Sequence, residues 1–82
     1  MELTINQLEQ IKMHFRLSPR QAETAKILMS GKVTTKEIAK ELKVSPGAAR
    51  QFIYNIHTKM RTESKGQLIV MLFDYILDND IH

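Results

Sequence analysis

Signals for the start of a helix recur along the whole chain of 82 residues. Four have the form Ser/Thr-x-x-Glu/Gln, in which the hydroxyl and the Glu or Gln side chain each accept a hydrogen bond from a backbone amide of the first turn. They begin at Thr4, Ser18, Thr34 and Ser64. A fifth start, Ser45-Pro46, is a capping residue followed by proline at the first helical position. No segment shows the sustained period-two alternation of a strand. The sequence therefore predicts an all-α protein with helices over residues 5–15, 19–30, 35–42, 46–60 and 65–77.

The composition excludes several functional classes. The chain is long enough for one small domain, and it contains no cysteine for disulfides or thiolate zinc sites. Its three histidines lie on separate segments, and no spacing indicates a catalytic triad, a carboxylate pair or a metal site. The longest apolar run, Leu68 to Phe73, is too short to cross a bilayer. We predict a cytoplasmic protein that is not an enzyme and has no cofactor, no metal and no membrane contact.

Charge is distributed unevenly along the chain. Residues 31–65 carry eight Lys or Arg and three Glu, a net charge of +5, whereas residues 66–82 carry a net charge of −3. A basic central segment is typical of proteins that bind a polyanion such as DNA, although an ordinary solvated surface has the same composition.

The helices predicted at 35–42 and 46–60, joined by a short turn, form a candidate helix-turn-helix. Ala39 is small where the two helices must cross closely, Val44 follows the turn, and Ile53 anchors the second helix. Many helical bundles contain such a pair, so the basic surroundings are needed to favour DNA binding.

The chain resembles the LuxR/FixJ-type DNA-binding domain of bacterial transcription regulators. The resemblance begins at Leu17-Ser18-Pro19-Arg20-Gln21-Ala22-Glu23 and continues through Lys36-Glu37-Ile38-Ala39, Leu42-x-Val44-Ser45, Ile53-x-Asn55-Ile56-x-x-Lys59-Met60 and Gln67-Leu68. It implies a four-helix bundle whose third helix enters the major groove and whose last helix often dimerises. We therefore expect residues 1–16 to be an N-terminal helical extension, and residues 17–82 to be the DNA-binding domain with a C-terminal dimerisation helix.

The predicted recognition helix begins with small residues. Lys43, just before it, stands where the family commonly has Gly, so a positive φ there would cost roughly 1–2 kcal/mol. Pro46 to Ala49 have no side chain that could donate a hydrogen bond to the bases. We therefore expect Gly47 to let the helix approach the DNA closely, and the side chains of the next helical turn to contact the bases. Arg50 suits guanine and Gln51 suits adenine. Tyr54 would touch the backbone or lie half-buried. The base-readout prediction is Gly47, Arg50, Gln51 and Tyr54.

Residues at helix ends and flanks are predicted to contact phosphates, or else to be merely solvated. They are Thr35, Lys36, Ser45 and Lys59.

The last helix is apolar at nine of ten positions from Leu68 to Leu77. In a small bundle the neighbouring helices cover only one side of such a helix. Soluble monomers rarely leave a large apolar surface exposed on the other side. We expect a homodimer seam here, formed by Leu68, Met71, Leu72, Tyr75 and Ile76. The alternative is that helix 5–15 packs on this face and completes a monomeric core.

The sequence thus favours a transcription regulator that binds double-stranded DNA sequence-specifically as a dimer. The rival hypothesis is a protein-interaction module on the same fold, which would dock to RNA polymerase or to another regulator, or sequester it. The small residues at the start of helix 46–60 favour that rival.

Overall fold

The computed structural model describes residues 1–79, and its five helices confirm the predicted all-α fold with an additional N-terminal helix. The helices are α1 (Ile5–Phe15), α2 (Pro19–Met29), α3 (Thr35–Leu42), α4 (Pro46–Met60) and α5 (Lys65–Asp78). Residues 1–79 contain no strand. The last three residues of the predicted 17–82 domain lie outside the described part of the chain.

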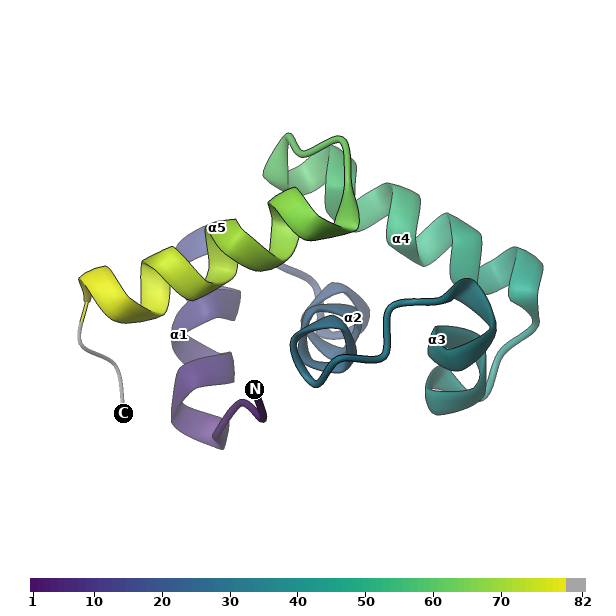
Figure 1. Ribbon diagram of the computed structural model, residues 1–82, viewed down its shortest axis with the longest axis horizontal. Helices are drawn as coiled ribbons and strands as arrows, with labels where there is room; N and C mark the ends of the chain where they lie inside the picture. The colour runs from purple at the N-terminus through teal and green to yellow at the C-terminus, as the bar shows by residue number, and fades with distance from the viewer. Residues whose placement is uncertain (80–82) are drawn as a thin grey trace.

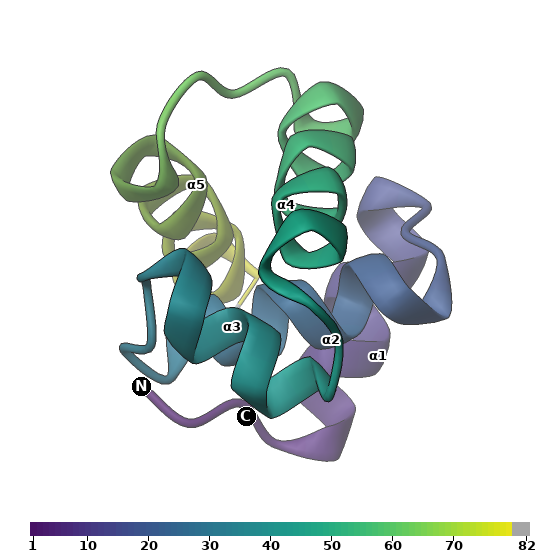
Figure 2. The same cartoon turned by 90° about the vertical axis from the view of Figure 1, so that its right-hand side faces the viewer.

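The molecule is elongated, with principal extents of 35 × 23 × 20 Å. Figure 1 shows α3 and α4 at one end, α1 and the C-terminal half of α5 at the other, and α2 between them. Turning the molecule brings α3 and α4 toward the viewer (Figure 2). The helix-turn-helix therefore lies at one end of the molecule, with the N-terminal helix at the other.

The predicted caps account for the helix starts. Thr4, Ser18 and Thr34 each form a complete capping box, and Ser45 accepts a hydrogen bond from the amide of Ala48. The fourth predicted box differs: Ser64 accepts from the amide of Gln67. The side chain of Gln67, however, accepts from the amide of Glu63 at 2.8 Å, one residue before the cap.

One continuous core joins all five helices. Its largest fully buried apolar side chains are Ile11, Leu28, Ile38, Ile56, Leu68 and Leu72. α1 contributes Ile11, which is completely buried, and packs against both α2 and α5. The rings of His14 and Tyr75 stack with their centroids 4.2 Å apart, and Phe15 meets Tyr75 edge-on. Residues 1–16 thus contribute side chains to the same hydrophobic core as the four helices that follow.

This packing corrects the predicted dimer seam. Leu68 and Leu72 are fully buried within the single chain and Ile76 is 3% exposed, so these three side chains cannot form a surface for a second copy. Tyr75 is half-buried beside His14. Met71, at 38% exposed, is the one predicted seam residue on the surface. α1 packs against α5, as in the alternative given above, but Val70, Phe73 and Leu77 stay exposed, so α1 does not cover all of the apolar surface of α5.

The turn between α3 and α4 contains the strained residue expected from the sequence. Lys43 has a φ of 59°, in the left-handed region, and its amide donates to the carbonyls of Ala39 and Lys40 at the end of α3. Arg16 and Arg61 end α1 and α4 in the same conformation, both with φ of 55°. Long side chains thus occupy three positions where glycine is the residue that helix ends usually favour.

Replacing Lys43 with Gly should raise the free energy of unfolding by roughly 0.5–1 kcal/mol. Relief of the left-handed conformation contributes about 1–2 kcal/mol and outweighs the greater unfolded-state freedom of glycine, about 0.5–1 kcal/mol. The control is Lys40→Gly, inside α3, which should lower the free energy of unfolding by about 1 kcal/mol. Urea denaturation measures both variants. Destabilisation by both would show that the turn carries no strain.

Candidate nucleic-acid interface

α3 and α4 pack through small and aliphatic residues that set how closely they cross. Ala39 on α3 is 4% exposed, and Ala49 and Ile56 on α4 are completely buried. Ile53 and Met60 complete the core face of α4. Because these apolar residues of α4 face the core, the opposite side of the helix lies at the surface.

The predicted base-readout residues lie together on that outer side of α4. Gly47, Arg50, Gln51 and Tyr54 are spaced three and four apart, which places them on one face of a helix. All four are exposed, and Tyr54 at 64% is well clear of the core, so the half-buried alternative for its ring is wrong. A methyl group at Gly47 would meet nothing nearer than Ser45 Oγ, at 4.0 Å. The fold itself therefore has no steric need for glycine at this position.

The predicted phosphate contacts are more scattered. Thr35 and Lys36 begin α3, the first half-buried and the second exposed. Ser45 caps α4 and Lys59 lies in the last turn of the same helix. At 1.5 Å per residue, Ser45 and Lys59 are about 20 Å apart along the helix axis. Because Ser45 and Lys59 lie at opposite ends of α4, the four residues do not form one compact cluster.

Two further lysines, Lys40 on α3 and Lys43 at its C-terminal cap, are not among the predicted phosphate contacts. Lys36, Lys40 and Lys43 are all exposed, so they form one basic stripe along α3 and its C-terminal cap. Their spacing in the sequence was the available signal. A first helix in this motif crosses the DNA backbone, which suits such a stripe.

The acidic residues of α3, Glu37 and Glu41, line one surface pocket together with Lys32 and Lys40. Glu41 forms a salt bridge with Lys32 in the preceding loop. The hydrogen bond and charge of Lys32 lower the pKa of Glu41, and the same hydrogen bond raises the pKa of Lys32. Lys32 is thus engaged with a carboxylate, whereas the lysine stripe has no salt bridge among the described residues.

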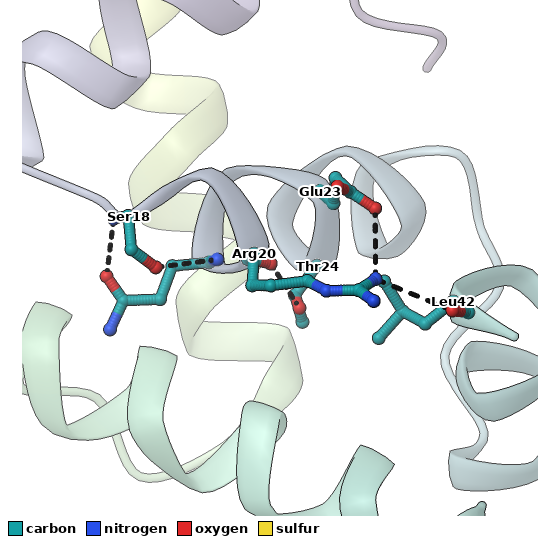
Figure 3. Close-up of polar contacts among 6 residues, drawn as sticks. Ser18, Arg20, Glu23, Thr24 and Leu42 are labelled. Atoms are coloured by element: carbon teal, nitrogen blue, oxygen red, sulfur yellow. Dashed lines mark hydrogen bonds and ion pairs between the residues drawn. The ribbon is translucent and has the colours of Figure 1, made fainter. Parts of the chain in front are cut away.

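Arg20 connects the beginning of α2 to both helices of the motif, and Figure 3 shows its contacts with Glu23 and with the end of α3. Its Nη1 lies 3.4 Å from Glu23 Oε2 and donates to the carbonyl of Leu42, also at 3.4 Å. This carbonyl is at the end of α3, where helical carbonyls lack backbone partners. The guanidinium also lies over the ring of Phe52 on α4, 5.6 Å from its centroid. One side chain therefore contacts the end of α3 and the flank of α4 together.

His57, near the end of α4, is not suited to charge-based phosphate binding. Burial, and after it the neighbouring charge of Lys65, lower the pKa of its imidazole, so the positively charged form is disfavoured. Its Nδ1 shares a hydrogen bond of 2.8 Å with the hydroxyl of Thr62, a buried residue. The pair joins the last turn of α4 to the loop before α5.

Comparison with known protein families shows to which family this helix-turn-helix belongs. Residues 16–72 match the bacterial regulatory proteins of the luxR family, a stretch that covers more than half of the chain. The chain belongs to the luxR family. The match spans α2 to α4 and the first half of α5, and leaves α1 outside. No curated protein and no solved structure matches the chain significantly.

Membership in the luxR family confirms the helix-turn-helix resemblance drawn from the sequence. The protein is a DNA-binding transcription regulator, and its fold is that of a regulatory family rather than of an enzyme family. In the described part of the chain, none of the helices combines the length and apolar character needed to span a bilayer.

Proposed function

We propose that this luxR-family regulator recognises specific sequences in double-stranded DNA through the outer side of α4. The supporting observation is the common exposure of Gly47, Arg50, Gln51 and Tyr54 on one helix face. Arg50 suits the two acceptors of guanine, and Gln51 suits the donor and acceptor of adenine. The small residues of the first turn let α4 approach the base edges closely.

Backbone contacts supply the affinity in this proposal. Lys36 and Lys40 lie on α3 and Lys43 at its C-terminal cap, and the amides at the beginning of α3 and α4 suit phosphate oxygens. Thr35 and Ser45 add hydroxyls at these two helix starts. Lys59 reaches a more distant phosphate from the last turn of α4.

We also propose that the protein acts as a homodimer in the bacterial cytoplasm, through an outer face of α5 that differs from the predicted seam. Val70, Phe73 and Leu77 are 58%, 41% and 61% exposed and are spaced three and four apart. These three side chains form an apolar surface of the kind that marks an interaction site. This surface, not the buried stripe of Leu68, Leu72 and Ile76, is available to a second copy.

The second candidate function uses the same exposed face for a different partner. A protein-interaction module would dock its α5 surface onto RNA polymerase or another regulator, and it would need no base readout. The absence of polar side chains from Pro46 to Ala49 favours this alternative.

Salt dependence of DNA binding separates the two functions. We expect log K for random double-stranded DNA to fall with log salt concentration, with a slope of about −0.9 for each phosphate neutralised. Lys36→Ala and Lys40→Ala should each make that slope about 0.9 shallower and weaken binding to all sequences alike. Lys26→Ala, an exposed lysine on α2, is the control and should leave the slope unchanged. Absence of DNA binding at low salt would favour the protein-interaction module.

A further inference from the structure

Gln51 is held in place by its own helix. Its Nε2 donates a hydrogen bond to Oδ1 of Asn55, with 2.9 Å between the two atoms. The residues are four apart, so their side chains are neighbours on α4. Gln51 is exposed and Asn55 is half-buried. A partly packed residue thus holds an exposed side chain that would otherwise sample several rotamers.

The hydrogen bond leaves Gln51 with the groups that adenine requires. One hydrogen of Nε2 is used, and the second hydrogen and the carbonyl oxygen Oε1 stay available. In the major groove adenine presents one acceptor, N7, and one donor, the N6 amino group. Guanine presents two acceptors there, which one donor and one acceptor do not match.

Holding the side chain in advance lowers the cost of binding. A free glutamine loses most of its rotamer freedom when it is ordered against a base, and that loss weakens binding. The bond to Asn55 imposes part of this order before DNA arrives. A merely structural pair of this kind would stabilise α4 slightly and would leave base preference unchanged.

The geometry points to Asn55 as a positioning residue for base recognition, which holds Gln51 in the rotamer that reads adenine. This inference rests on the proposed DNA-binding function, and it concerns one base pair of the recognised site. Asn55 itself touches no base in this arrangement and acts through Gln51.

Base preferences measured on four proteins, the wild type, Gln51→Ala, Arg50→Ala and Asn55→Leu, test the inference. Sites are first selected from a random double-stranded pool with the wild type, and each position is then varied to all four bases. The base pair that Gln51 contacts is identified as the position at which Gln51→Ala lowers the preference for adenine. The expected loss of preference is roughly 5- to 150-fold. Asn55→Leu should lower it at the same position by roughly three- to tenfold. The preference that depends on Arg50 should stay as in the wild type, and circular dichroism should show an unchanged fold.

Two further variants separate positioning from charge and from general damage. Asn55→Leu added to Gln51→Ala should change nothing more, because the residue to be positioned is gone. Asn55→Asp keeps the acceptor oxygen, so it should retain the adenine preference while its charge weakens binding to all sequences. If the wild type has no base preference, sequence-specific recognition and this inference both fail. If Asn55→Leu leaves the Gln51 preference intact, only this inference is overturned.

Discussion

Leu72→Glu should abolish the cooperative thermal unfolding transition, whereas Phe73→Glu, one residue later, should leave the protein folded. Leu72 is completely buried in the core of the single chain, and Phe73 is 41% exposed on the other side of α5. Loss of a buried leucine costs about 2–5 kcal/mol, and burial of an unpaired polar group adds at least about 1–3 kcal/mol. A domain of this size has a total stability of only about 4–12 kcal/mol. Thermal melts followed by circular dichroism measure the difference.

The same pair of variants tests the proposed dimer. Phe73→Glu places a charge in the apolar surface formed with Val70 and Leu77, so sedimentation should show a folded monomer where the wild type is a dimer. A wild type that is itself monomeric at several hundred micromolar would contradict the dimer. A cooperatively folded Leu72→Glu would contradict the burial of this side of α5.

Gly47→Leu should lower DNA affinity roughly tenfold or more without destabilising the protein. Within the chain, a side chain at Gly47 has open space, so its bulk acts only on what approaches from outside. A leucine there would hold α4 away from the groove, and each hydrogen-bonded side chain that can no longer reach its base weakens binding by about 1–3 kcal/mol. Gly47→Ala should raise the melting temperature, because alanine favours a helix over glycine by up to about 1 kcal/mol.

Gly66 supplies a matched control for this experiment. It is the second residue of α5, as Gly47 is of α4, and a methyl group there would likewise meet only a capping serine oxygen at 4.0 Å. Gly66→Leu should therefore have the same effect on helix stability and none on DNA binding. Gel-shift titrations and thermal melts compare the variants. Unchanged DNA affinity in Gly47→Leu would mean that α4 does not approach DNA by its first turn.

Several features of this protein were determined by the sequence alone. Helix starts depend on hydrogen bonds between residues three apart, so Thr4, Ser18, Thr34 and Ser45 marked them without reference to the rest of the fold. The exposed face of α4 followed from spacing, because Ile53, Ile56 and Met60 had to face the core.

The tertiary structure decided what spacing left ambiguous. With nine apolar residues in ten, the sequence of α5 has almost no polar contrast to tell its two sides apart, and the packing of α1 and α2 selected Leu68, Leu72 and Ile76 as core. The link from Arg20 to Leu42 and Phe52 is likewise invisible in the sequence, because it joins residues more than 20 positions apart. Local hydrogen bonds are encoded within a few residues, whereas the choice between two apolar faces depends on which neighbours the whole chain brings against them.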